Sequence, residues 1–359
     1  MARKAMIAMS GGVDSSVAAL LMQQHGWTCA GVTMKLYQNE TVGACGTHTC
    51  CTLEDVEDAR AVAYALGMKH YVFNFSDRFR ETVIERFVRA YQAGCTPNPC
   101  IDCNRFLKFE TLHHRARELG YDVVATGHYA RVEYDKERQK FLLKKAKDPT
   151  KDQSYVLYSI SQEQLSRTCF PLGALKKTQT RGIAQAHGLV NARKHDSQDL
   201  CFVPEGDYAA FLERFTGSDC PPGDFIDEKG HVLGRHRGLI RYTVGQRRGL
   251  GLSFPEPMYV KAVDAAANTV TLAPEHALYS RTLIASDINL IDCGSITGTL
   301  SVKAKVRYRH QEQWASVRQE GARLRIVFDE PQRAITKGQA VVLYDGETVL
   351  GGGTIEDTE

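Results

Sequence analysis

The residues whose types and spacing point most directly to chemistry form the segment Ser10-Gly11-Gly12-Val13-Asp14-Ser15-Ser16. A short apolar run at 5–9 precedes this segment, and a stretch with helical character at 13–24 follows it. The two glycines allow a tight turn whose backbone N–H groups point outward, and the start of a helix adds the positive end of its dipole. Serine hydroxyls supply further donors, and the Asp14 carboxylate suits a magnesium ion. We therefore predict a strand–loop–helix unit that cradles pyrophosphate.

This loop differs from the G-x-x-x-x-G-K-[ST] loop of γ-phosphate-transferring enzymes because it has no lysine to reach the phosphates. It resembles instead the signature loop of ATP pyrophosphatases, which split ATP into AMP and pyrophosphate to activate an oxygen atom. The alternative interpretation is a Gly-Gly turn in a serine-rich loop. The strand-like run before it and the helical stretch after it favour nucleotide binding.

Composition and length narrow the classes of protein that fit. The chain has 359 residues, enough for two or three domains. No apolar run approaches the roughly 20 residues that a membrane helix needs, and the start of the chain does not read as a signal peptide. We therefore expect a cytoplasmic protein with no membrane partner. Its eleven cysteines are then expected as buried, catalytic or metal-bound thiols rather than structural disulfides.

The net charge of +3 is too small to indicate nucleic-acid binding, but the basic residues are clustered. Lys and Arg outnumber acidic residues in 140–151 and in 229–261. A third set alternates with apolar or small residues, so on a strand its members would share one face: Lys303, Lys305, Arg307 and Arg309. Three such patches favour a polyanionic partner, although each alone is explained about equally well as a solvated surface.

The pattern of elements predicts an α/β fold of the doubly wound type in the first half of the chain. Four strand-like runs alternate with helical stretches: 5–9, 28–34, 70–75 and 122–126. The helical stretches include 54–66 and 105–119, and each is followed by a glycine. This alternation implies a parallel sheet with helices on both faces and ligands at the carboxyl ends of the strands.

Changes in composition predict three domains. Residues 1–203 would form the doubly wound, parallel-sheet ATP-pyrophosphatase domain. Glycine and proline then become frequent, which indicates a small loop-rich middle domain at 204–275. Short alternating runs with no helical pattern follow, which predicts a C-terminal β-barrel-like domain at 276–359.

The second chemical signal is the segment Thr96-Pro97-Asn98-Pro99-Cys100-Ile101-Asp102-Cys103-Asn104. Asn104 is suited to cap a following helix, which would place Cys103 near a helix N-terminus, where the dipole favours the thiolate. Cys100-x-x-Cys103 also fits half of a zinc site, and other cysteines could complete it: Cys45, Cys50 and Cys51. The motif alone leaves metal binding and catalysis equally open. Cys201, far along the chain, would on its own be interpreted as an inert buried thiol.

Taken together, the motifs resemble those of the bacterial tRNA-specific 2-thiouridylases, nearly end to end and in the order of that family. Besides the nucleotide loop and the segment around Cys103, the matching motifs are Ala125-Thr-Gly-His-Tyr-Ala130, Lys151-Asp-Gln-Ser-Tyr155, Asp196-Ser-Gln-Asp-Leu-Cys201-Phe202, Tyr242-Thr-Val-Gly-Gln-Arg-Arg-Gly-Leu-Gly251 and Val327-Phe-Asp-Glu-Pro331.

The resemblance implies ATP-dependent 2-thiolation of the wobble uridine in tRNAs for glutamate, glutamine and lysine. It implies a sulfur donor protein of the cysteine-desulfurase or relay type, and Cys103 and Cys201 as the catalytic pair. The matching ATP-binding positions are Ala8, Met9, Ser10, Gly11, Gly12, Val13, Asp14, Ser15, Met34 and Gly127. The matching tRNA-binding positions are Asn98, Pro99, Cys100, His128, Lys151, Asp152, Gln153, Tyr308, Arg309 and Gln339.

In this chemistry the C2 oxygen of uracil attacks the α-phosphate of ATP and expels pyrophosphate. A persulfide on Cys201 then supplies the sulfur. Either its terminal sulfur attacks C2 directly, or Cys103 attacks the persulfide and releases hydrosulfide. Both routes require the two thiols to meet, with Cα atoms within roughly 7 Å of each other.

One position departs from a common form of the family, because Cys100 stands where many relatives carry an aspartate proposed as the acid–base. Asp102 is a weak substitute, so that role stays open. The departure also creates a set of three thiols, Cys100, Cys103 and Cys201, which could hold an iron–sulfur cluster. Two rival functions remain: a small-molecule synthetase with the same ATP loop, and a non-catalytic RNA-binding or zinc-clipped structural protein.

Overall fold

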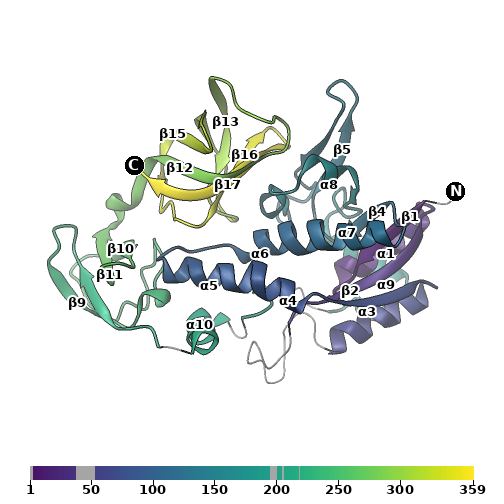
Figure 1. Ribbon diagram of the computed structural model, residues 1–359, viewed down its shortest axis with the longest axis horizontal. Helices are drawn as coiled ribbons and strands as arrows, with labels where there is room; N and C mark the ends of the chain where they lie inside the picture. Colours follow the sequence, from purple (N-terminus) through teal and green to yellow (C-terminus); the bar gives the residue numbers. More distant parts are fainter. Residues whose placement is uncertain (1–2, 38–52, 195–199, 204–205, 218) are drawn as a thin grey trace. The chain divides into compact units, whose positions relative to one another are not determined.

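The computed structural model describes residues 3–37, 53–194, 200–203, 206–217 and 219–359 (Figure 1). Cys45, Cys50 and Cys51, the candidate partners of a zinc site, lie outside the described residues. So does the predicted motif residue Asp196 with the three residues that follow it.

The chain divides into two compact units, which we describe separately. The N-terminal unit comprises Met1–Val83, Cys100–Gly206 and Gly346–Leu350. The barrel unit comprises Ile84–Pro99, Asp207–Asp345 and Gly351–Glu359. The domain boundaries expected after residues 203 and 275 stay predictions. None of the helices in the described part of the chain is long and apolar enough to cross a membrane.

A five-stranded sheet forms the centre of the N-terminal unit, and each strand runs parallel to its neighbours. Across the sheet the strands are β3 (Lys69–Asn74), β2 (Thr28–Lys35), β1 (Lys4–Ala8), β4 (Val123–Thr126) and β7 (Thr168–Cys169). The prediction of a parallel sheet is confirmed, and the four strands expected from the sequence all form. Strand β7 is only two residues long, too short for any periodicity to reveal it.

Helices cover both faces of this sheet, as a doubly wound fold requires. The longest are α1 (Val13–Gln24), α3 (Leu53–Ala65), α7 (Leu112–Glu118) and α9 (Lys177–Ala186). Shorter elements are α4 (Ser76–Phe79), the π-helix η1 (Arg80–Ile84), the 3-10 helix η3 (Ser154–Leu157), α8 (Gln162–Ser166) and the hairpin of β5 (Arg131–Asp135) and β6 (Lys140–Lys144). The helix α5 (Glu85–Gln92) belongs to the barrel unit.

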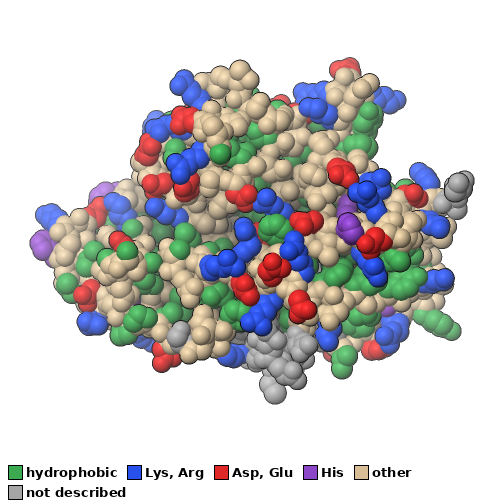
Figure 2. Space-filling model, in the orientation of Figure 1, with side chains coloured by type: hydrophobic (Ala, Val, Ile, Leu, Met, Phe, Trp, Pro, Cys, Tyr) green, Lys and Arg blue, Asp and Glu red, His purple; other side chains and the backbone are tan. Residues whose placement is uncertain are grey.

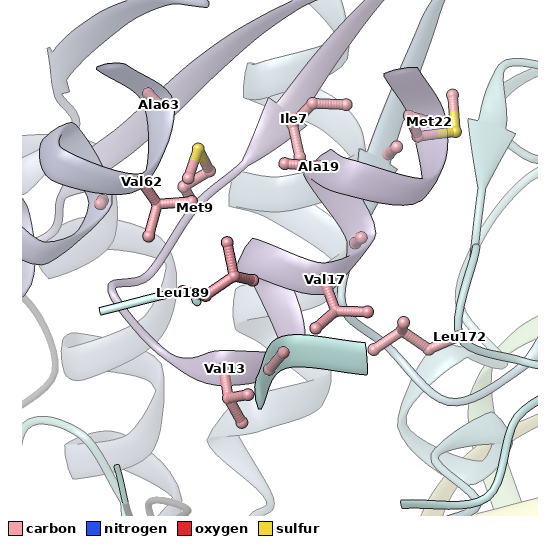
Figure 3. Packing of buried hydrophobic residues seen from close by; sticks show 14 of the residues in the cluster. Ile7, Met9, Val13, Val17, Ala19, Met22, Val62, Ala63, Leu172 and Leu189 are labelled. Atoms are coloured by element: carbon pink, nitrogen blue, oxygen red, sulfur yellow. The ribbon is translucent and has the colours of Figure 1, made fainter. Parts of the chain in front are cut away.

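The alternation of side chains along β1 explains why its sequence is apolar throughout. Ile7 packs with residues of α1, α3 and α9 in one core, part of which Figure 3 shows. Met6 belongs to a second core with Val32 and Leu112, on the opposite face. Successive side chains of a strand point to opposite faces, so a sheet covered on both faces requires apolar residues at both.

The strand order also locates the ligand crevice. The chain passes from β1 through α1 to β2 on one side, whereas β4 lies on the other side of β1. Such a reversal separates the loops that leave the carboxyl ends of β1 and β4, and ligands of open α/β sheets bind there. The glycine-rich loop follows β1, and Thr126-Gly127 ends β4, so both sequence signals meet at this crevice.

The helix that carries the first thiol pair starts earlier than expected. It runs as α6 (Pro99–Asp102), the π-helix η2 (Cys103–Thr111) and α7. Pro99 fits its first position because the missing N–H has no acceptor there anyway. The expectation that Asn104 caps the helix is wrong, because Asn104 lies inside it and its Nδ2 donates to the carbonyl of Val156 at 3.0 Å.

The barrel unit contains two sheets. The smaller follows α10 (Tyr208–Thr216) and has the order β10 (Met258–Asp264), β11 (Thr269–Pro274), β8 (Gly223–Ile226) and β9 (Val232–His236). The larger has the order β12 (Tyr279–Leu290), β15 (Arg323–Arg333), β14 (Gln313–Glu320), β13 (Thr299–Lys305), β16 (Ala340–Asp345) and β17 (Thr348–Thr358), followed by β6 and β5. The residues of β17 that pair with β6, Thr348 and Val349, belong with that hairpin to the N-terminal unit. A further pairing of β12 with β17 closes this sheet, so the predicted barrel is confirmed.

Arg307 is a structural residue of this unit and not part of a basic surface. Strand β13 ends at Lys305, so the alternation that predicted one shared basic face does not continue to Arg307. Its Nη2 donates to the carbonyls of Val244, at 2.9 Å, and Ala334, at 3.0 Å, and to the hydroxyl of Thr336. Arg307 therefore ties the segment before β10 to the loop between β15 and β16.

We expect Arg307→Met to destabilise the barrel unit by about 1–3 kcal/mol, because at least two backbone carbonyls lose a charged donor. Thermal unfolding of the full-length protein measures this as a lowered midpoint. Arg309→Met is the matched control, because Arg309 is exposed and its loss should change stability by less than about 0.5 kcal/mol. Equal midpoints for the two variants would contradict the structural role of Arg307.

Candidate phosphate-loop and thiol site

Gly11 fixes the shape of the loop between β1 and α1. Its φ is +74°, and a Cβ atom there would lie 2.4 Å from the carbonyl oxygen of Asp55. Gly12 is the N-cap residue of α1 and makes no side-chain cap. The hydroxyls of Ser15 and Ser16 donate back to the Gly12 carbonyl, at 3.0 and 3.1 Å. The first N–H groups of α1 therefore remain open to an external anion.

Gly127 lets the end of β4 approach this helix start. A Cβ atom at Gly127 would lie 2.8 Å from the backbone carbon of Asp14 and 2.8 Å from the backbone nitrogen of Ser15. Both are backbone atoms, so a side chain there could be admitted only if the loop moved. The sequence prediction that Gly127 belongs with the loop therefore agrees with its position.

Two side chains from distant parts of the chain, which no sequence pattern had predicted at this site, already contact the Asp14 carboxylate. The Nζ of Lys177, the first residue of α9, lies 2.7 Å from one carboxylate oxygen and 2.8 Å from the other. The hydroxyl of Tyr129 donates to the same carboxylate at 3.0 Å and lies 3.0 Å from the hydroxyl of Thr180. The loop itself contains no lysine, but α9, which is distant in the sequence, supplies one to it.

Asn191 braces the loop from the same part of the chain. Its Nδ2 donates to the carbonyl of Gly11 at 2.9 Å and lies 2.8 Å from the Ser16 hydroxyl. The side chain is buried, and its Oδ1 has no hydrogen-bond partner among the described residues. Sequence reasoning missed Asn191 and Lys177 because single polar residues far from a motif carry no local signal.

The other predicted ATP-binding positions lie around the same loop. The Ser10 N–H donates to the Ser15 hydroxyl at 3.2 Å, and the Met9 carbonyl accepts from Thr33 at 2.9 Å. Ala8 ends β1, Val13 begins α1, and Met34 lies one residue before the end of the adjacent β2. All ten predicted positions therefore lie at or next to the carboxyl ends of β1, β2 and β4 in the N-terminal unit.

The two predicted catalytic thiols have different surroundings within the N-terminal unit. Cys103 is buried at the start of the π-helix η2, whereas Cys201 is partly exposed. The Cys201 carbonyl accepts a hydrogen bond of 2.5 Å from Tyr37, whose ring packs against Phe79. Phe79 also contacts Phe202 edge-on and lies on α4, which packs against η2. This aromatic cluster connects the backbone of Cys201 to the helix of Cys103.

The three-thiol set expected as an alternative is not gathered into a metal site. Among the residues that the structure describes, no three His, Cys, Asp or Glu side chains are placed to hold a metal ion. Cys100 is exposed and Cys103 is buried. The arrangement of Cys100, Cys103 and Cys201 therefore does not fit an iron–sulfur cluster.

The pKa values of four other cysteines are raised by burial of the thiol. It raises the pKa of Cys29 and of Cys169 to about 11, so both thiols stay protonated at neutral pH. Burial also raises the pKa of Cys95 and of Cys220. We therefore assign no nucleophilic role to Cys29 and Cys169.

His128 is buried in the described structure. Burial, together with the nearby Lys108 ammonium, holds the pKa of His128 well below its usual range, so the ring is neutral. Its Nδ1 lies 2.7 Å from the Thr126 hydroxyl, and its Nε2 lies 3.5 Å from the Lys108 Nζ. A tRNA contact at His128 would therefore require this side chain to become accessible.

The predicted tRNA segment Lys151-Asp152-Gln153 is tied to the nucleotide site through Tyr129. The Oε1 of Gln153 accepts from the Tyr129 N–H at 2.9 Å, and the Asp152 carboxylate accepts from the Ala146 N–H at 2.9 Å. All three residues of the segment remain partly exposed.

The remaining tRNA positions lie in the barrel unit, apart from Cys100. Tyr308 and Arg309 are exposed, Asn98 is partly exposed and Pro99 is buried. The Nε2 of Gln339 donates to the carbonyl of Thr96 at 2.6 Å, and the Thr96 N–H donates to the carbonyl of Lys337 at 2.8 Å. Gln339 therefore holds the segment that leads into Asn98 and Pro99.

Ion pairs partly neutralise the basic clusters seen in the sequence. In 229–261, Arg241 pairs with Glu213 at 2.6 Å and Lys261 pairs with Glu228. In 140–151, Lys144 pairs with Glu133 at 2.5 Å. On the face that Figure 2 shows, Lys and Arg side chains are likewise interspersed with Asp and Glu side chains.

The parallel sheet with its uncapped loop–helix junction defines a nucleotide-binding α/β domain of the HUP class. Family models match the chain in three parts. A tRNA methyl transferase HUP domain matches residues 3–205, a tRNA methyl transferase PRC-barrel domain matches 209–274, and an aminomethyltransferase beta-barrel domain matches 280–355.

The protein belongs to the tRNA-specific 2-thiouridylase family. It is 48% identical to the tRNA-specific 2-thiouridylase MnmA of Acetivibrio thermocellus, over 99% of both chains. It is 49% identical to that of Moorella thermoacetica, over 98% of this chain and 99% of the relative. The solved structure of a 4-thiouridine synthetase–RNA complex with bound ATP covers 60% of this chain and 50% of its own, with 16% identity and a TM-score of 0.36, which is too distant to support an argument.

We expect Gly127→Ala to weaken ATP binding by tenfold or more, because the added methyl would displace the backbone at Asp14 and Ser15. Isothermal titration with ATP measures this loss. Gly182→Ala in α9 is the matched control, because a Cβ atom there meets nothing within 4 Å. Unchanged ATP affinity in Gly127→Ala would show that the approach of β4 to the loop does not shape the binding site.

Proposed function

We propose that this protein catalyses ATP-dependent 2-thiolation of the wobble uridine in tRNAs for glutamate, glutamine and lysine. The observation that carries the proposal is the match to tRNA-specific 2-thiouridylases over 99% of both chains. ATP and tRNA would place the reaction in the cytoplasm. The rival functions, a small-molecule synthetase and a non-catalytic RNA-binding or zinc-clipped structural protein, have no comparable support.

In the first step, the loop and the start of α1 bind the phosphates of ATP. The C2 oxygen of uridine attacks the α-phosphorus, the bond to the bridging oxygen breaks, and pyrophosphate leaves. The uncapped N–H groups of α1 stabilise the negative charge that develops on that leaving group. Mg²⁺ would neutralise phosphate charge, and Asp14 is the carboxylate placed to hold it once Lys177 releases that side chain.

In the second step, sulfur replaces the activated oxygen. The terminal sulfur of a Cys201 persulfide attacks C2, and AMP leaves with the original C2 oxygen. The Cys103 thiolate then attacks Cys201 Sγ, which breaks the S–S bond, leaves sulfur on C2 and forms a Cys103–Cys201 disulfide. A thiol reductant returns both cysteines to thiols, and a cysteine desulfurase or relay protein renews the persulfide. In the hydrosulfide route the Cys103 thiolate attacks Cys201 Sγ first, which forms the disulfide and releases hydrosulfide. The hydrosulfide then attacks C2, and AMP leaves with the original C2 oxygen.

Contacts in the N-terminal unit support this pairing. Tyr37 donates a hydrogen bond to the Cys201 carbonyl. Phe79 contacts Phe202, the residue after Cys201, and lies on α4, which packs against the π-helix η2 that begins at Cys103. Partial exposure leaves Cys201 accessible to a donor protein, while burial shields Cys103 from other oxidants. Both properties suit a persulfide carrier and a resolving thiol.

We assign tRNA contacts to the matching positions in both units. Exposed Tyr308 offers a ring for stacking, and exposed Arg309 offers a guanidinium for phosphate. The segment of Asn98 to Cys100 would lie beside the target base, which is already single-stranded in an anticodon loop and therefore inexpensive to extrude. Lys151, Asp152, Gln153, His128 and Gln339 complete the proposed tRNA contacts.

We expect Cys201→Ala and Cys103→Ala each to abolish 2-thiouridine formation while ATP affinity stays within about twofold of wild type. The reason is that neither thiol belongs to the phosphate loop. Mass spectrometry of nucleosides from tRNA, with pyrophosphate release measured in parallel, gives both readouts.

Cys169→Ala is the matched control, because burial raises the pKa of its thiol to about 11 and it should thiolate like wild type. Thiolation by Cys201→Ala at the wild-type rate would contradict the persulfide mechanism. Pyrophosphate release that needs a small carboxylate and no tRNA would favour the synthetase instead.

We also expect protein purified without oxygen to be fully active when it contains no iron, since the three thiols are not gathered as cluster ligands. Metal analysis and thiolation of the same sample test this. Activity that scales with bound iron would overturn the persulfide route in favour of a cluster.

A further inference from the structure

The ammonium group of Lys177 lies at the uncapped start of α1, although Lys177 is 163 residues away from Asp14 in the sequence. Its Nζ makes contacts of 2.7 and 2.8 Å with the two oxygens of Asp14. The Lys177 side chain is only 11% exposed, whereas that of Asp14 is 31% exposed. The lysine thus approaches the loop from the protein side, and the carboxylate lies nearer to solvent.

Other contacts fix the position of this lysine. The backbone N–H of Lys177 donates to the buried Asp148 carboxylate at 2.9 Å, which anchors the start of α9. The Lys177 Nζ lies 5.9 Å from the centre of the Tyr129 ring, and the hydroxyl of that ring donates to Asp14. Because the backbone is anchored, the flexible side chain can change partners without movement of the helix.

The phosphate loop contains no residue with a full positive charge, and Lys177 supplies one. Phosphate loops that transfer the γ-phosphate carry their own lysine, and this loop has none. Backbone N–H groups and a helix dipole supply only partial charges, whereas pyrophosphate carries several full negative charges. Without a cation beside it, the Asp14 carboxylate would repel that charge.

We propose that Lys177 is the cation that binds the pyrophosphate moiety of ATP, and that Asp14 holds it until ATP arrives. On binding, the ammonium exchanges the carboxylate for phosphate oxygens, and Asp14 is released toward the magnesium ion that accompanies ATP. The inference rests on the proposed function only in assuming that the loop binds ATP.

No group in the described part of the chain donates to the buried Oδ1 of Asn191, which is a second sign that this site is incomplete without a ligand. Buried polar atoms in native proteins almost always have a partner, and a bound nucleotide with its ordered water would bring donors to this region. Asn191 and Lys177 both contact the loop from residues 177–191, so one distant segment both braces and completes the site.

The test measures affinity of the full-length protein for inorganic pyrophosphate, ATP and AMP by isothermal titration. We expect Lys177→Met to weaken pyrophosphate and ATP binding at least tenfold and AMP binding less than threefold. Retained AMP binding shows that the crevice is still folded. Lys176→Met is the matched control, because the adjacent Lys176 is exposed, and it should bind all three like wild type.

A double variant separates lost attraction from new repulsion, since Lys177→Met alone leaves the Asp14 carboxylate without its cation. Without magnesium, the Asp14→Asn, Lys177→Met protein should bind pyrophosphate at least tenfold more weakly than Asp14→Asn. Equal affinity of these two variants would overturn the proposal, because the loss in Lys177→Met would then come from Asp14 alone.

Two further results would also overturn it. If Lys177→Met binds pyrophosphate like wild type, the ion pair with Asp14 is only structural, and the proposed function still stands. If the wild-type protein binds neither ATP nor pyrophosphate, the proposed function fails together with this inference.

Discussion

The open N-terminus of α1 is the constraint on which the rest of this structure depends. A helix start without a side-chain cap presents N–H groups that an external anion can satisfy, so the loop before it must be held by other means. Three distant parts of the chain hold it. Asp55 lies against Gly11, Gly127 lies against Asp14 and Ser15, and the segment from Lys177 to Asn191 contacts both sides of the turn. A phosphate site made in this way needs a complete α/β fold around it, which explains why so short a motif occurs inside so large a domain.

The proposed sulfur chemistry depends on how the environments of Cys103 and Cys201 differ from those of the other cysteines. Burial holds the Cys29 and Cys169 thiols protonated, so these two cysteines do not compete with Cys103 and Cys201 as nucleophiles. Cys103 and Cys201 lie instead on a helix of partly π character and in a turn fixed by Tyr37. Stretches of π-helix occur often at functional sites. The aromatic contacts of Phe79 connect these two segments, so displacement of one segment would displace the other.

Much of the fold could be predicted from the sequence, because apolar runs of strand length and glycine-terminated helical patterns are local signals. The loop and Gly127 could be predicted as one site because both follow strands that end at the same edge of the sheet. Lys177 and Asn191 could not, because their importance arises only when α9 packs beside α1. The prediction of Asn104 as a cap was wrong because Pro99, five residues earlier, is also a residue type that favours the first position of a helix, and the helix begins there. Arg307 was misinterpreted as a surface charge because alternation does not reveal where β13 ends.

In the proposed reaction, ATP bound at the start of α1 activates the C2 oxygen of uridine. The most direct measurement is the fate of that oxygen, with tRNA carrying ¹⁸O at C2 of the target uridine. Mass spectrometry of the AMP formed in a single turnover should find one ¹⁸O atom for each 2-thiouridine made. AMP that contains no ¹⁸O, formed alongside thiolated tRNA, would contradict the claim.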